Sequence, residues 1–201
     1  MRMKQLEELA LQALEQEKTG ISVYTAAVTC AVNKALKYEW LKRIEQTKLH
    51  VAVLNEMCGT LRIDVKKETA GRDVVRGRSR SLVEAMRKGK EAGDPAAAEL
   101  IACECVVIAA TKHHLGWALL GKCVEHVGEA RASLLKRACD EIEQQESEHL
   151  CHAKGWCREL WTQSLGIKAV LPPPEERRTV RTPPGAARTE RTAADENHRP
   201  A

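Results

Sequence analysis

The sequence predicts an all-α protein, an antiparallel bundle of four long helices with a long crossover between the second and third. The composition is dominated by Ala, Leu, Val, Glu, Lys and Arg and contains no phenylalanine, which is typical of helical proteins. Apolar residues recur at alternating intervals of three and four along several segments, as the buried stripe of a helix requires. The pair Asp94-Pro95 combines a favourable N-cap residue with proline at the first helical position.

The first helix is predicted from about Lys4 to about Val32. Its buried stripe includes one charged residue, Glu17, and a glycine, Gly20, which allows close helix packing or room for a bound group. The stripe consists of Leu6, Ala10, Ala13, Glu17, Gly20, Tyr24, Ala27 and Ala31. A carboxylate in an apolar stripe is costly unless it is paired or bound to a cation, so Glu17 is a candidate functional residue.

The second helix is predicted from about Leu36, after a tight turn near Asn33, to Cys58, with Gly59 as the residue that ends it. His50 lies at the margin of its apolar face. The charged, glycine-rich stretch 62–93 is predicted to be a crossover containing one short helix, with Ser81 and Glu84 forming its capping box. A crossover of this length allows the next helix to start at the opposite end of the bundle.

The third helix is predicted from Asp94 to about Val127, and the fourth from about Ala130 to Leu165, with a break at Gly128. Residues 1–170 thus form one helical domain. Residues 171–201 are rich in Pro, Arg, Thr and Ala and contain few large apolar side chains, so they cannot bury a core and are predicted to be a disordered tail.

The charge pattern and the cysteines narrow the classes of function. The net charge is only +4 and the basic residues alternate with acids, which argues against nucleic acid as a partner. The sequence shows neither the apolar run of a signal peptide nor a stretch that spans a bilayer, so we expect a cytoplasmic protein with no membrane association. The eight cysteines are then free thiols, mainly core residues. Exposed apolar residues on long helices allow a homodimer.

The most informative motif is Glu146-x-x-His149. Both residues fall on the predicted core stripe of the fourth helix, which also contains Ile142, Ala153, Trp156 and Leu160. Carboxylate and imidazole ligands suit iron, manganese and zinc. Turns near Asn33 and Gly128 bring polar residues of all four helices to nearly one height. The candidate metal ligands of this layer are Glu17, His50, Glu104, Glu146 and His149.

At these residues the chain resembles the ferritin-like superfamily. Glu17 followed by Tyr24 looks like the first-helix pair of rubrerythrin-type members, and Glu146-x-x-His149 looks like their fourth-helix ligand pair. Residues 45–51 and 154–161 are similar to an uncharacterised bacterial branch of the superfamily. The resemblance covers about residues 4–165. It implies iron or manganese, possibly in a dinuclear centre, and oxidoreductase chemistry toward oxygen or peroxide.

The sequence also allows other interpretations. Thr47 stands where the family pattern has a second-helix Glu, and Ala110 lies nearest the expected third-helix ligand. Lys48 is positioned to form a salt bridge with Glu17 in place of a metal, which would leave a non-catalytic scaffold. Glu104 has the alternative of pairing with a cation. Of the adjacent His113 and His114, at most one faces the layer, because neighbouring residues point about 100° apart on a helix. The cysteines allow a third function, thiol-based redox sensing.

Overall fold

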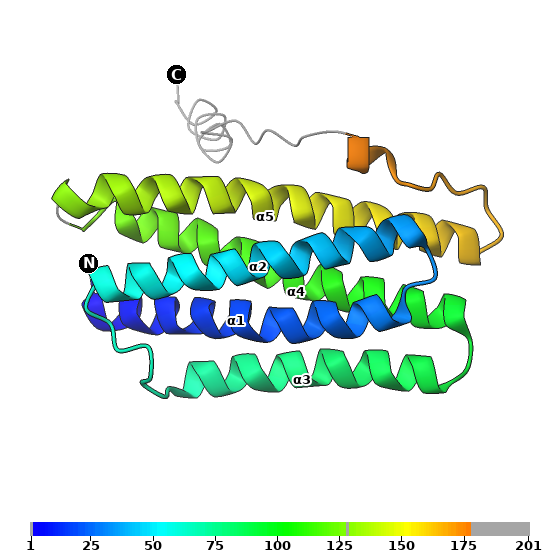
Figure 1. Cartoon of the computed structure of the whole chain (residues 1–201), viewed down its shortest axis with the longest axis horizontal. Helices are drawn as coiled ribbons and strands as arrows, with labels where there is room; N and C mark the ends of the chain where they lie inside the picture. The colour runs from blue at the N-terminus through cyan, green and yellow to red at the C-terminus, as the bar shows by residue number, and fades with distance from the viewer. Residues whose placement is uncertain (1, 128, 178–201) are drawn as a thin grey trace, which may run out of the picture.

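The computed structural model describes residues 2–127 and 129–177, with the side chains of 129–134 and 177 excluded. The described residues form five α-helices and one short 3-10 helix, and the predicted all-α class is confirmed (Figure 1). The elements are α1 (Met3–Cys30), α2 (Lys34–Thr60), α3 (Ala70–Glu91), α4 (Pro95–Val124), α5 (Glu129–Ser164) and η1 (Pro174–Arg177). None of these helices is long and apolar enough to cross a membrane.

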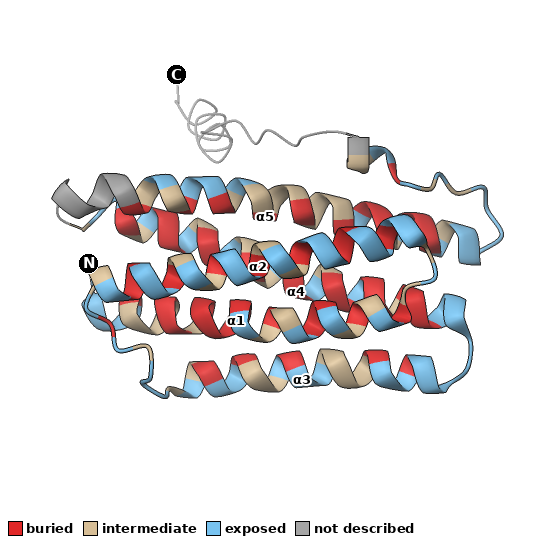
Figure 2. Cartoon of the chain, in the orientation of Figure 1, coloured by how far each residue is buried: buried red, intermediate tan, exposed pale blue. Residues whose placement is uncertain are grey.

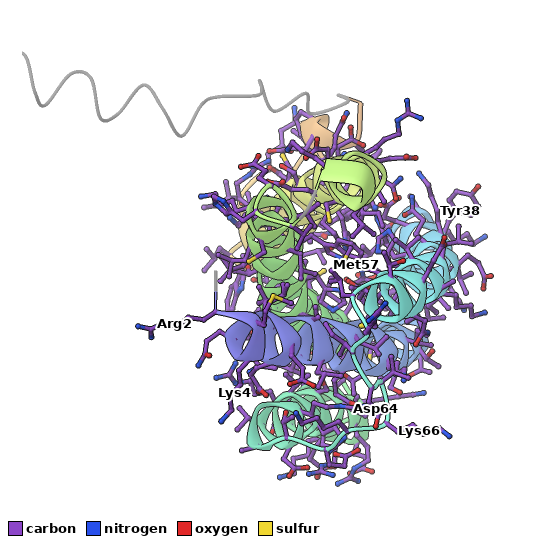
Figure 3. The ribbon with its side chains drawn as sticks, turned by 90° about the vertical axis from the view of Figure 1, so that its left-hand side faces the viewer. Arg2, Lys4, Tyr38, Met57, Asp64 and Lys66 are labelled. Atoms are coloured by element: carbon purple, nitrogen blue, oxygen red, sulfur yellow. The ribbon has the colours of Figure 1, made fainter. Side chains whose placement is uncertain are left out.

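Four of the helices surround a common core. α1 contacts α2 and α4, and α5 contacts α4 and α2, so the four form a closed ring. α1 and α5 run in one direction, whereas α2 and α4 run in the other (Figure 1). α3 lies outside this ring against α1 and α4, as the view along the bundle shows (Figure 3). It returns the chain to the end where α2 began, so α4 starts there as the crossover predicted.

The crossover is more helical than predicted, because α3 is a helix of 22 residues rather than a short one. It begins after Thr69, whose side chain accepts a hydrogen bond from the Arg72 amide at 3.2 Å. Ser81 and Glu84, predicted as a capping box, lie inside the helix. The buried stripe of α3 includes Arg72 and Ser79, so a search for apolar periodicity alone does not reveal it.

Two other helix ends show where local signals succeed and fail. Asp94 caps α4 as predicted, accepting hydrogen bonds from the amides of Ala96 and Ala97. Gly59 does not end α2, which continues to Thr60. The residue with left-handed backbone is Arg62, at φ 59°. The Ile63 amide closes this end by donating to the Cys58 carbonyl at 2.8 Å, the pattern of a Schellman motif.

The apolar core is divided into two clusters along the bundle. One contains Trp40 and Trp156, and the other contains Leu11, Leu54 and Trp117. Along each of the four ring helices, buried polar residues separate the members of one apolar cluster from the members of the other. Figure 2 shows buried positions on the facing sides of the helices, including this middle section. The polar layer therefore occupies the centre of the core, not one end.

The chain after α5 folds back onto the bundle. η1 contacts α5, and the Trp156 indole nitrogen donates to Glu176 Oε1 at 2.6 Å. Arg158 forms an ion pair with Glu175 at 2.6 Å. The first residues of the predicted tail, 171–177, thus pack against α5. Residues 178–201, the rest of that predicted tail, and the predicted break at Gly128 lie outside the described residues.

A buried ion pair fixes α3 against α1, and its loss has a predictable cost. The Arg72 guanidinium donates to Glu15 Oε2 at 2.6 and 2.8 Å, and both side chains are over nine-tenths buried. Replacing Arg72 with Met leaves Glu15 buried with only Arg76 beside it, at 3.3 Å. We expect a loss of about 3 kcal/mol in the free energy of unfolding, measured by urea denaturation.

The matched control is Arg87→Met on the same helix. Arg87 pairs with Glu84 on the surface, where such ion pairs contribute little. We expect its unfolding midpoint to stay within error of wild type. Equal midpoints for Arg72→Met and Arg87→Met would contradict the structural role given to the Arg72–Glu15 pair.

Candidate metal centre

Three ligand-type side chains from three helices meet in the polar layer. Glu17 lies on α1, His50 on α2 and Glu146 on α5, and one ligand atom of each lies within 4.8 Å of the others. His50 Nδ1 is 3.2 Å from Glu146 Oε1 and 3.5 Å from Glu17 Oε2. All three residues are at most 2% exposed. The predicted juxtaposition of Glu17, His50 and Glu146 is therefore present in the structure.

The remaining helix of the ring, α4, contributes His113. Its Nδ1 lies 3.2 Å from Glu17 Oε1. Gly20 makes room for the ring, because a Cβ at this position would lie 2.6 Å from His113 Cε1. Glu17 Oε1 also accepts a hydrogen bond from the Trp117 indole at 2.8 Å. α4 therefore holds Glu17 Oε1, while His50 approaches Oε2.

His149 lies beside this group and is held by Tyr24. Its Nδ1 is 3.2 Å from the Tyr24 hydroxyl and 3.8 Å from Glu146 Oε2. If the ring donates through Nδ1, the hydroxyl accepts, and Nε2 presents a lone pair. Tyr24 was predicted mainly as a core residue, and its hydroxyl gives it the additional role of orienting an imidazole.

Gln145 fixes the orientation of His50. The Gln145 Oε1 atom is 3.1 Å from His50 Nε2. An amide oxygen only accepts, so Nε2 carries a proton and donates it. Nδ1 then faces the two carboxylates either with a lone pair or with a second proton. An outer hydrogen bond of this kind is how proteins orient a histidine that binds metal.

The layer contains buried polar atoms that the protein itself does not satisfy. Among the described residues, the buried side-chain nitrogen and oxygen atoms without a hydrogen-bond partner belong to Glu17, His50, His113, Glu146, His149 and His152. The first five form the layer. The contacts among them, at 3.2 to 3.8 Å, lack hydrogen-bond geometry, and native proteins rarely leave such groups unsatisfied. These atoms are concentrated at one place, where a cation would satisfy several of them at once.

The buried charges shift the pKa values of the carboxyl groups and of His50. Burial alone would raise the pKa of Glu17, but His113 and His50 lower it below its ordinary value. Burial likewise opposes the charge on Glu146, yet His149 and His50 bring its pKa well below the ordinary value. Burial disfavours a charged His50, but Glu146 and Glu17 outweigh it and raise the pKa to about 10. In the metal-free layer a proton on His50 compensates the carboxylates.

The other two imidazoles respond differently to the same burial. Burial and the nearby Arg43 guanidinium lower the pKa of His149 to about 4, although Glu146 opposes the shift. Burial also acts to lower the pKa of His113, but Glu17 raises it above the ordinary value. His149 is therefore neutral at physiological pH and available as a ligand without losing a proton.

One predicted ligand is outside the layer. Glu104 is exposed on α4, and its Oε1 accepts a hydrogen bond from the Trp161 indole at 3.0 Å. The predicted pairing of Glu17 with Lys48 is also wrong, because the exposed Lys48 forms an ion pair with Glu45 at 2.6 Å. Glu17 is paired by histidines instead. Lysine has therefore not replaced a cation in the layer.

The sequence allows either His113 or His114 to face the layer, and it also contains a signal that favours His113. The residues Val106, Ala110, His113, Trp117, Leu120 and Val124 follow one another at alternating intervals of four and three, and all are buried. Glu104 does not fall on this stripe. Gln145 had no such signal, because its role depends on the rotation of α5 relative to α2.

The donor set of the layer suits a divalent transition metal. Carboxylate and imidazole groups are ligands for iron, manganese and zinc, and the layer has two carboxylates and three imidazoles. The four ring helices hold them in a buried place, and their outer partners are Trp117, Tyr24 and Gln145. Such outer partners fix ligand orientation in protein metal sites.

Comparisons with protein-family models, curated proteins and solved structures find no match for this chain. The geometry and chemistry of the buried layer are therefore the features that bear on function.

The close approach of Gly20 to His113 gives a direct test of the layer's packing. In Gly20→Ala the new methyl group would overlap the His113 ring, so we expect a loss of about 1–3 kcal/mol in the free energy of unfolding. Gly77→Ala on α3 is the control, since a Cβ there meets no atom within 4 Å. That variant should gain about 0.5–1 kcal/mol from helix propensity. A stabilised Gly20→Ala protein in urea denaturation would contradict the observed packing.

Proposed function

We propose that this chain is a ferritin-like bundle that binds a divalent transition metal, iron or manganese, in its buried layer. Glu17, His50 and Glu146 are the proposed ligands, with His113 and His149 beside them as further donors. The observation that carries the proposal is the convergence of ligand atoms from four helices, many without a hydrogen-bond partner, at the centre of an apolar core.

The arrangement of the helices supports the ferritin-like assignment. α1 and α2 form one antiparallel pair, α4 and α5 form the other, and a long connection returns the chain between them. Bundles with one such crossover include the ferritin-like folds. In this chain the connection contains α3, which packs against α1 and α4.

The number of donors favours one metal ion over two. Dinuclear bundle sites use a Glu from each of two helices and a Glu-x-x-His pair from each of the other two. The layer has two carboxylates and three imidazoles, and the buried Thr47 stands where a second-helix Glu would be. We therefore propose a mononuclear site in place of the dinuclear centre that the resemblance implied.

The protein groups around the site determine what can reach it. A small pocket of about 10 Å³ between α1 and α4 is lined by Glu17, His113 and Trp117, with Gln16 and Lys112 also on its wall. This is about the space of a single water molecule. Bound iron or manganese would supply one-electron chemistry toward oxygen or peroxide.

The thiol-sensor hypothesis receives less support. Burial is the main cause of a raised pKa for Cys30, Cys58, Cys103, Cys105, Cys139, Cys151 and Cys157. A raised pKa reduces the thiolate fraction and hence the reactivity. These cysteines fit the role of core residues, so the metal function is the stronger proposal.

The first test is metal stoichiometry. Wild-type protein reconstituted anaerobically with Fe²⁺ or Mn²⁺ should retain about one ion per chain in the central site, as its donor set predicts. Glu146→Gln keeps the size of the side chain but removes its charge, and it should lose that ion. Elemental analysis after gel filtration measures the metal content of the wild type and of Glu146→Gln. The control is Glu104→Gln, which should retain wild-type metal because Glu104 lies on the surface.

Either of two results would overturn the proposal: no retained metal in the wild type, or full stoichiometry in a folded Glu146→Gln protein. In the first case, protons on the histidines are the permanent partners of the carboxylates. The bundle is then a scaffold without a metal.

Metal uptake should also release protons. At neutral pH, His50 holds a second proton because its pKa is raised to about 10, and a metal that binds Nδ1 must displace it. Affinity should therefore rise with pH between about 6 and 8. Isothermal titration calorimetry in buffers of different ionisation enthalpy counts the released protons. An observed enthalpy independent of the buffer would show that His50 is not a ligand.

A further inference from the structure

A second group of ligand-type side chains lies where α2, α5 and η1 meet. It consists of Glu39, His152 and Glu176, and one ligand atom of each lies within 4.8 Å of the others. His152 is six residues beyond Glu146 on α5, which corresponds to about 9 Å along the helix. The group is therefore separate from the central layer, and it is partly open to solvent.

The His152 ring is enclosed but makes no hydrogen bonds. Its side chain is 13% exposed, and both ring nitrogens are buried without a hydrogen-bond partner. An imidazole in this position has neither a protein acceptor for its proton nor a donor for its lone pair. Such a group normally has a partner, and the nearest polar atoms are carboxylate oxygens.

Two carboxylates lie beside this ring, and a contact to Trp156 orients one of them. The Trp156 indole occupies Glu176 Oε1 at 2.6 Å, while Glu176 Oε2 lies 3.6 Å from His152 Nδ1. Glu39 Oε1 lies 3.7 Å from the same nitrogen. Zinc bonds of about 2.1 Å at tetrahedral angles separate neighbouring ligand atoms by about 3.4 Å. Both separations are thus close to the edge length of a zinc site.

The local charge also favours a cation. Arg43 Nε lies 3.0 Å from Glu39 Oε1, which balances one carboxylate. Glu176 lies beside Trp156 and His152, and Arg158 pairs with Glu175 and Glu159 instead. Among the described residues, no lysine or arginine forms an ion pair with Glu176 in this half-buried place.

From this geometry we propose that Glu39, His152 and Glu176 form a second site, which binds Zn²⁺ with water at the remaining position. Three protein ligands with an open position are common for zinc. Because Glu176 comes from the segment after α5, the ion joins this segment to α2 and α5. Gly155 allows this segment to pack closely against α5, since a Cβ there would lie 3.1 Å from Pro173 Cβ. This inference is independent of the function proposed for the central layer.

The test is equilibrium dialysis of the full-length chain against Zn²⁺ under reducing conditions. His152→Ala and Glu176→Gln should each bind about one ion fewer per chain than wild type, because each removes a ligand. His114→Ala is the control, as a half-buried histidine outside both groups. Circular dichroism establishes that each variant is folded. Wild-type zinc stoichiometry in both ligand variants would overturn the proposal.

Glu146→Gln separates this proposal from that of the central layer. If both proposals hold, Glu146→Gln and His152→Ala each lose a different ion and the double variant loses both. If only the central proposal fails, Glu146→Gln binds as much zinc as wild type while His152→Ala still loses an ion. Co²⁺ in place of zinc should give a visible spectrum without thiolate charge-transfer bands, because nitrogen and oxygen ligands are proposed. Strong thiolate bands that persist in His152→Ala would instead place the ion on cysteines.

A second readout follows the segment itself. The exposed Lys168 lies between α5 and η1. The Val170 amide beside it donates to Glu159 Oε2 at 2.8 Å, so trypsin cleaves after Lys168 faster when the segment detaches from α5. Saturating Zn²⁺ should slow this cleavage several-fold in wild type and in His114→Ala, but not in His152→Ala. Equal cleavage rates with and without zinc in the wild type would contradict the proposed link, and a peptide substrate controls for direct inhibition of trypsin by zinc.

Discussion

The need to compensate buried charge at the centre of the bundle constrains the rest of the structure. Glu17 and Glu146 lie between two apolar clusters, where an unpaired carboxylate costs several kcal/mol. His50 and His113 contact them from two other helices. This pairing requires one relative height of the ring helices, since a shift of one helical turn would leave carboxylates and imidazoles against apolar side chains. The polar layer therefore specifies the register that apolar packing alone would leave less defined.

The same groups create the conditions for binding. The contacts within the layer are close, but they leave ring nitrogens and carboxylate oxygens without aligned partners. A fully apolar layer of similar volume would often be as stable or more stable, so the layer is not explained by stability. A cation of suitable size satisfies several of these atoms at once. Gln145, Trp117 and Tyr24 hold the donors in place from outside, which reduces the rearrangement needed for binding.

The additional elements enclose this arrangement. α3 covers the face formed by α1 and α4, so α1 is in contact with three helices and buries residues well beyond a single stripe. The segment after α5 covers the other side, where Glu176 approaches His152. The two proposed sites share α2 and α5 as supports. One is inside the core, and the other exists only while the segment is docked, so the two would respond differently to changes in the terminal segment.

The sequence by itself determined the helical class, the main helices to within a few residues and the capping by Asp94. It also placed Glu17, His50, Glu146 and His149 near one height, because these features depend on local propensity and on the period of the helix. Tertiary structure decided the outcomes that depend on how helices rotate against one another. Glu104 faces solvent, His113 replaces it in the layer, and Lys48 pairs on the surface. α3 is long because its buried face uses Arg72 paired with Glu15, and Glu176 reaches His152 because the chain reverses after α5. The periodicity of α4 already favours His113 over Glu104. No periodicity within one segment reveals the Arg72–Glu15 or the Glu176–His152 contact, since the partners lie on separate elements.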